Sequence, residues 1–213
     1  MSLQVTDIEF LIEAFVIFFV VIDPIGLAPI FNLLSHGEER SEKNRIVLHA
    51  VIIANIVLLS FAFIGDFLLS ALHISDPAFR IAGGLLLLVL AVDMVIVRHS
   101  GISTATPAER SEARHRSDLS VFPLAIPLIA GPGGLTTVVL LMRKIEHNYV
   151  LQAGLLLVLC FVLFLTYISL RYAEKISGVI GLTGSNVVSR VLGILLVALS
   201  IQLIIDGIKL AFL

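Results

Sequence analysis

The sequence predicts an all-α membrane protein with six transmembrane helices, arranged as two inverted three-helix repeats. The 213-residue chain is 58% hydrophobic and 14% charged, whereas a typical soluble domain is about 45–50% apolar and about 25% charged. Its long apolar runs are separated by short polar segments, and a motif of paired prolines occurs once in each half. Because a membrane-spanning helix needs about 20 mostly apolar residues, this length allows six spans and short loops.

Six apolar runs are the expected spans, in chain order: Phe10–Leu34, Ile46–Leu72, Pro77–Val97, Leu119–Met142, Tyr149–Tyr172 and Val187–Leu213. Ser75 and Asp76 before Pro77 form a helix-start signal for the third span, and Thr183 to Asn186 offer caps before the sixth. The segment 98–118 is polar and contains glycine and proline, which predicts a flexible linker. It would join a first repeat, residues 1–97, to a second, residues 119–213.

Lysine and arginine are unevenly distributed between the two sides that these spans would create. Four of the 14 lie on one side, namely Arg80, Arg143, Lys144 and Lys209. The other ten lie on the opposite side, in or beside the loops that follow the first, third and fifth spans. Basic residues concentrate in cytoplasmic loops, so we expect the linker inside the cell and both termini outside.

The repeat rests on two proline pairs at one offset. Pro24 and Pro29 in the first span match Pro127 and Pro132 in the fourth, 103 residues later in each case. Three spans per half is an odd number, so the two halves would insert in opposite senses. Inverted repeats of this kind are common in secondary transporters, which bind substrate near the bilayer midplane on discontinuous helices.

Proline and glycine in the first and fourth spans predict broken helices, because proline lacks a backbone donor and clashes with the preceding turn. Asp23 before Pro24 and Gly131 before Pro132 resemble a helix cap followed by a first-turn proline. Each half would then present the positive N-terminus of a short helix inside the membrane, which suits a carboxylate. A proline kink used only for packing is the alternative. The expected substrate-binding residues are Asp23, Pro24, Gly26, Pro29, Pro127, Gly131, Pro132, Gly133, Gly134 and Thr136.

These same segments resemble a known family. The strings IDPIGLAPIF, from Ile22, and FPLAIPLIAGPGGLTT, from Phe122, are similar to the paired signatures of the MarC-type integral membrane proteins. That family is also described as a six-span neutral amino acid transporter family. The resemblance extends along the chain to Asp206-Gly207-Ile208. It implies a protein of the bacterial or archaeal inner membrane, with some relatives proposed to carry small neutral amino acids such as glycine and alanine.

Other polar residues inside the spans are secondary candidates, because charge in a membrane is costly and often functional. Asp93 lies near the cytoplasmic end of the third span and Asp206 is placed to pair with Lys209. Asn55 is expected to join helices through its amide.

Composition also excludes several classes of function. The formal charge of −2 lacks the basic footprint of a nucleic-acid-binding protein, and a single cysteine, Cys160, allows no internal disulfide. No phosphate-binding loop, nucleophile elbow or metal-ligand spacing occurs in the sequence.

We therefore expect a transporter, not an enzyme, with no cofactor beyond a coupling proton or sodium ion. Its partners would be the lipid bilayer and a small solute, and self-association stays open. The alternative is a membrane sensor or assembly partner that transports nothing.

Overall fold

The computed structural model describes residues 5–96, 119–145 and 148–212. The predicted linker at 98–118 lies outside the described residues. Every described element is a helix: α1 (Val5–Ile22), α2 (Pro24–Leu34), α3 (Arg40–Ala71), α4 (Asp76–Ile96), η1 (Ser120–Ile129), α7 (Pro132–Lys144), α8 (Tyr149–Arg171) and α9 (Ala173–Phe212). The predicted all-helical class is therefore confirmed for this part of the chain.

Five of the described segments are long and apolar enough to cross a membrane: Asp7–Leu34, Arg40–Ala71, Asp76–Ile96, Tyr149–Arg171 and Thr183–Phe212. A sixth span results if η1 and α7, which are bent by 53° relative to each other, cross as one unit. These segments correspond to the six predicted spans. The predicted cap segment Thr183 to Asn186 lies at the start of the sixth candidate span, Thr183–Phe212. Helix α9 as a whole begins earlier, at Ala173, and is divided by a kink at Gly181, where φ is 68°.

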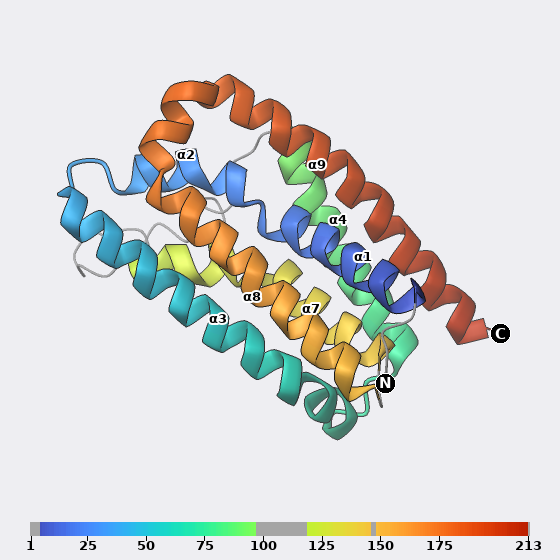
Figure 1. Ribbon diagram of the computed structural model, residues 1–213. Coiled ribbons are helices and arrows are strands. Elements are labelled where there is room, and N and C mark those ends of the chain that lie inside the picture. Colours follow the sequence, from blue (N-terminus) through green and yellow to red (C-terminus); the bar gives the residue numbers. More distant parts are fainter. Residues whose placement is uncertain (1–4, 97–118, 146–147, 213) are drawn as a thin grey trace.

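The helices lie against one another in two groups. Helix α8 packs between α1 and α3, whereas α9 packs along α4 and also contacts α2 (Figure 1). Large side chains such as Phe18, Leu58 and Leu159 are fully buried between helices. The outward faces are also apolar, with Phe63 67% exposed and Leu157 71% exposed. An apolar exterior of this kind is suited to lipid.

Figure 1 also shows that the start of α1 and the end of α9 lie at one end of the molecule. The α3–α4 connection reaches the same end, and the opposite end carries the α2–α3 and α8–α9 connections. An arrangement with both terminal helices ending together is the one expected of an even number of crossings.

Glycines allow α4 and α9 to approach closely. A Cβ atom at Gly84 would lie 2.8 Å from the carbonyl oxygen of Ser200, and one at Gly193 would lie 2.9 Å from Cβ of Met94. Gly207 makes the same kind of approach to the carbonyl oxygen of Pro77, at 3.0 Å. Small residues with this role are typical of helix pairs in membranes.

Candidate functional site

The junction between α1 and α2 is formed by a single residue, Asp23, and we call it the Asp23 junction. Asp23 adopts the left-handed conformation, with φ 47° and ψ 64°, and its carboxylate accepts a hydrogen bond from the N–H of Gly26 at 3.0 Å. Its side chain thus caps α2, and Pro24 occupies the first turn, where the missing N–H has no helical acceptor in any case. The sequence predicted this capping role for Asp23.

Three serine hydroxyls from the C-terminal half of the chain surround this junction. Ser189 donates to Oδ2 of Asp23 at 2.7 Å. Ser169 donates to the carbonyl oxygen of Pro24 at 2.6 Å, and Ser185 donates to that of Ile25 at 3.3 Å. These three serines were not predicted from the sequence. They lie 145 to 166 residues from their partners, and their only local signal is a hydroxyl inside an apolar helix.

Gly26 is needed for this arrangement. A Cβ atom at this position would lie 2.0 Å from Oδ2 of Asp23 and 2.5 Å from Oγ of Ser189. Any side chain here would therefore displace the carboxylate from its hydroxyl donor.

The second junction, between η1 and α7, is built from irregular backbone, and we call it the Gly131 junction. Phe122 and Ile126 have extended φ/ψ values inside η1, and Gly131 is extended at the N-cap of α7, where no side chain caps the helix. A Cβ atom at Gly131 would lie 2.4 Å from the carbonyl oxygen of Pro127. Proline and glycine therefore allow a sharp bend directly before α7.

Apolar side chains surround the start of α7, in contrast to the hydroxyls at the Asp23 junction. A Cβ atom at Gly133 would lie 3.1 Å from Cδ2 of Leu87 and 3.3 Å from Cγ1 of Val21. Val21 is two residues before Asp23, so α1 contacts α7 within two residues of each junction along the chain. A solvated cavity shared by both junctions stays a prediction.

Aligned prolines have different structural positions in the two halves. Pro24 begins α2, whereas its sequence match Pro127 lies inside η1. Pro29 lies inside α2, whereas its match Pro132 begins α7. Helices α2 and α7 therefore begin at prolines that the sequence repeat does not align with each other, and their starting points are five residues apart in that alignment.

A cavity of about 140 Å³ lies at the end of the molecule where α1 begins, and we call it the mixed-charge cavity. Its polar lining contains both signs of charge, in Glu13, Arg80, Lys144 and Asp206, and its floor is made of leucine and isoleucine side chains. Lys144 Nζ lies 3.0 Å from Oε1 of Glu13. Thr137 also lines this cavity; it is 3% exposed, and its hydroxyl has no hydrogen-bond partner within the described part of the chain.

The remaining predicted residues have varied positions. The methyl group of Thr136 packs at the position of Gly83, whose Cβ would lie 2.2 Å from Cγ2, and a role of Thr136 in substrate binding stays a prediction. Asn55 joins α3 to α8, with Nδ2 3.9 Å from Sγ of Cys160. Asp93 is half-buried near the end of α4.

The predicted pairing of Asp206 with Lys209 is wrong. Asp206 instead accepts a hydrogen bond from Nε2 of Gln202 at 2.9 Å. Residues four apart also share a helix face, and the amide of Gln202 reaches the carboxylate along it.

The helical spans, the apolar exterior and the polar junctions within the spans define a multi-pass integral membrane protein. A family model described as MarC family integral membrane protein matches residues 8–212. The chain therefore belongs to the MarC family.

Full-length relatives occur in archaea and bacteria. A UPF0056 membrane protein of Methanocaldococcus jannaschii is 36% identical over 94% of this chain and 87% of its own length. UPF0056 membrane protein YvbG of Bacillus subtilis is 31% identical, over 94% of this chain and 95% of its own. UPF0056 membrane protein YhcE of Escherichia coli is 31% identical, over 95% and 94%. No solved structure shows significant similarity to the chain.

Proposed function

We propose that this protein is a secondary transporter of small zwitterionic solutes, with neutral amino acids as the first class to test. The substrate would bind between the Asp23 and Gly131 junctions. A proton or sodium gradient would supply the energy. The protein would lie in the cytoplasmic membrane of a bacterium or archaeon, with both termini outside.

The observation that carries this proposal is the carboxylate of Asp23 inside the candidate span Asp7–Leu34. An acidic side chain at such a position is costly and is usually functional. Oδ1 accepts one hydrogen bond, from Gly26, and Oδ2 accepts one, from Ser189. A carboxylate has about four acceptor positions, so Asp23 retains acceptor capacity for an ammonium group or a coupling cation.

The start of α7 offers the complementary charge. The first N–H groups of a helix have no helical acceptor and carry a partial positive charge, and Gly131 provides no side-chain cap for them. Val21 of α1 packs at Gly133 of α7. A negative side chain at the α1–α2 junction and a positive helix end on α7 would suit the two charges of a zwitterion.

The mixed-charge cavity supplies an approach route. Thr137 lines it four residues after Gly133, and Leu87 both lines it and packs on Gly133. Its lining combines paired charges with apolar side chains. A small solute entering here would meet α7 within one helical turn of the proposed site.

Two inverted halves would explain how the site opens to alternate sides, by motion of one three-helix unit against the other. The repeated proline pairs and the return of both terminal helices to one end support this interpretation. Pro24 and Pro127 have different positions relative to the helix starts, so the two proposed halves would differ locally.

The test is uptake of a panel of labelled amino acids by the purified protein in liposomes, with an imposed proton gradient, a sodium gradient or neither. We expect saturable uptake of at least one small neutral amino acid, with competition by its unlabelled form. Liposomes containing heat-inactivated protein are the control. Equal, unsaturable uptake in both preparations for every solute would favour the non-transporting sensor or assembly partner.

A further inference from the structure

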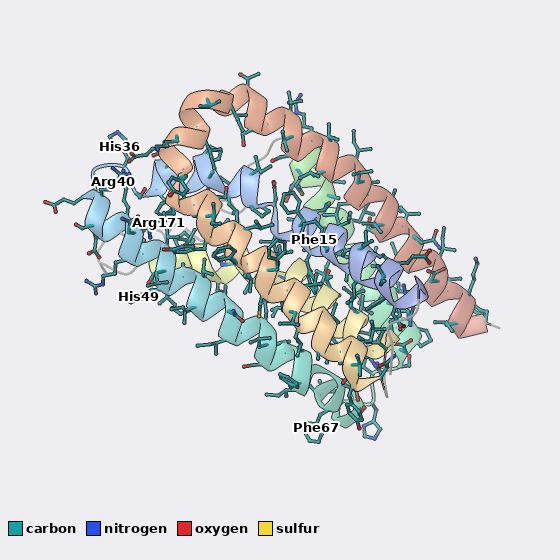
Figure 2. All side chains as sticks on the ribbon, in the orientation of Figure 1. Phe15, His36, Arg40, His49, Phe67 and Arg171 are labelled. Atoms are coloured by element: carbon teal, nitrogen blue, oxygen red, sulfur yellow. The ribbon has the colours of Figure 1, made fainter. Side chains whose placement is uncertain are left out.

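A second cavity, also of about 140 Å³, lies at the opposite end of the molecule, where α2 and α8 end and α3 and α9 begin. We call it the basic cavity. Its lining contains four cationic side chains and one carboxylate: Arg40, Lys43, Arg171, Lys175 and Glu174. Figure 2 shows Arg40 and Arg171 at this end, reaching it from different helices. The local charge is therefore positive, although the chain as a whole has a formal charge of −2.

The carboxylate in this group is already paired. Lys43 Nζ lies 2.8 Å from Oε1 of Glu174, and this hydrogen bond holds the pKa of the Glu174 carboxyl below its usual value. Arg171 donates to the hydroxyl of Tyr167, and Lys175 lies over the ring of Tyr172. Within the described residues, no ion pair joins Arg40, Arg171 or Lys175 to a carboxylate.

Ser35 provides an independent observation. It lines the basic cavity, is 0% exposed to solvent, and its hydroxyl has no hydrogen-bond partner among the described residues. A buried hydroxyl without a partner is unfavourable, so a bound group that accepts or donates a hydrogen bond there would be favoured. The amides of Asn32 and Asn44, which line the same cavity, add neutral hydrogen-bonding groups.

The start of α3 adds further donors. The N-cap residue Glu39 makes no side-chain hydrogen bond to the helix, so the first N–H groups of this 32-residue helix keep their donor capacity. Helix N-termini of this kind favour anions, and phosphate groups in particular. A cavity that holds one water needs about 10–15 Å³, so about 140 Å³ accommodates a phosphate group and several waters.

We propose that the basic cavity binds a phosphate-bearing anion, with the head group of an anionic phospholipid as its source. Basic pockets between transmembrane helices on the cytoplasmic side commonly bind phospholipid head groups. All four cations belong to the side that the lysine and arginine distribution predicts to be cytoplasmic. This site is distinct from the proposed solute site and does not depend on it.

Binding is measured by isothermal titration of the purified full-length protein with two probes, dihexanoyl phosphatidylglycerol and inorganic phosphate. Dihexanoyl phosphatidylcholine, which has no net charge, is the control ligand. Saturable binding of phosphatidylglycerol alone supports the lipid source, and comparable binding of inorganic phosphate supports a free phosphate ion. Affinity should fall as ionic strength rises, because salt screens the interaction. Failure of both anions to saturate, or equal binding of phosphatidylcholine, would overturn the proposal.

Variants test the residues. Arg171→Gln should weaken anion binding at least tenfold, whereas Arg45→Gln should change it less than twofold, because Arg45 pairs with Glu42 and lies outside the cavity lining. Glu174→Gln should strengthen anion binding, since it removes the carboxylate that forms an ion pair with Lys43. Glu174 is 62% exposed, so this variant should fold normally. Weaker binding in Glu174→Gln, or equal binding by wild type and Arg171→Gln, would exclude the cavity as the site.

Discussion

At the scale of single residues, Asp23 accepts two hydrogen bonds at the α1–α2 junction, one from the Gly26 N–H and one from the hydroxyl of Ser189. An acid directly before a proline predicts a cap because both residues lie in one turn, and the carboxylate does accept the Gly26 N–H. The hydroxyls of Ser169, Ser185 and Ser189 were not predicted, because their proximity arises from packing of α8 and α9 on α2. The packing of the Thr136 methyl group at Gly83 likewise depends on the fold.

The first prediction concerns Gly26→Ala. The added methyl would lie 2.0 Å from the Asp23 carboxylate and would break its hydrogen bond to Ser189, so we expect a loss of about 1–2 kcal/mol. Gly178→Ala is the matched control, because a Cβ there meets no atom within 4 Å and alanine favours helix by about 1 kcal/mol. Thermal unfolding in detergent measures both. A Gly26→Ala protein as stable as Gly178→Ala would contradict the geometry at the Asp23 junction.

At the scale of helices, the lengths of the apolar runs in the sequence predicted the spans, and the turn-forming residues between them predicted the connections. Two features could not be predicted in this way. Helix α9 includes a short helical segment from Ala173, which precedes the sixth span and is separated from it by the kink at Gly181. The extended residues Phe122 and Ile126 inside η1 form a backbone that no periodic pattern describes.

The close approach of α4 and α9 leads to a second prediction. A Cβ added at Gly84 would lie 2.8 Å from the carbonyl oxygen of Ser200. A backbone atom cannot relieve such a contact by changing rotamer, as a side chain can. Overpacking costs about 1–3 kcal/mol, so Gly84→Ala should lower the thermal unfolding midpoint in detergent. Gly178→Ala again serves as the control. An unchanged midpoint for Gly84→Ala would mean that the two helices separate more easily than their packing indicates.

The mixed-charge cavity leads to a third prediction. In a Cys160→Ala background, a cysteine at Thr137 should react with a small, charged thiol reagent, because Thr137 lines the cavity. A cysteine at Leu157, which is 71% exposed on the outward face of α8, should stay unreactive in liposomes because that face meets lipid. Equal reactivity at both positions would contradict the assignment of the cavity as an aqueous route.

At the scale of the whole molecule, the membrane class and the six-span pattern were predictable because apolar composition and span length are global properties. Orientation depends on charge distribution alone, which leads to the fourth prediction. Alkaline phosphatase, which is active only outside the cytoplasm, should be active when fused after Leu213 and inactive when fused at Thr106. The reverse activities would place the lysine- and arginine-rich side outside and remove the basis for the proposed topology.

The proposed transport mechanism depends on the charge of Asp23 more than on its capping role. Asparagine caps helices about as well as aspartate, so Asp23→Asn should still accept the Gly26 N–H and should unfold at a temperature close to that of wild type. Asp23→Ala lacks the cap and should lose about 1 kcal/mol. The two variants therefore separate folding from function.

The most direct measurement is the initial rate of solute uptake by Asp23→Asn and wild-type protein, reconstituted at equal amounts in liposomes, across a range of pH and sodium concentration. We expect the initial uptake rate of Asp23→Asn to be at least tenfold lower at unchanged stability, since an amide cannot supply the negative charge for an ammonium group or coupling cation. A wild-type rate with unaltered pH and sodium dependence would contradict it.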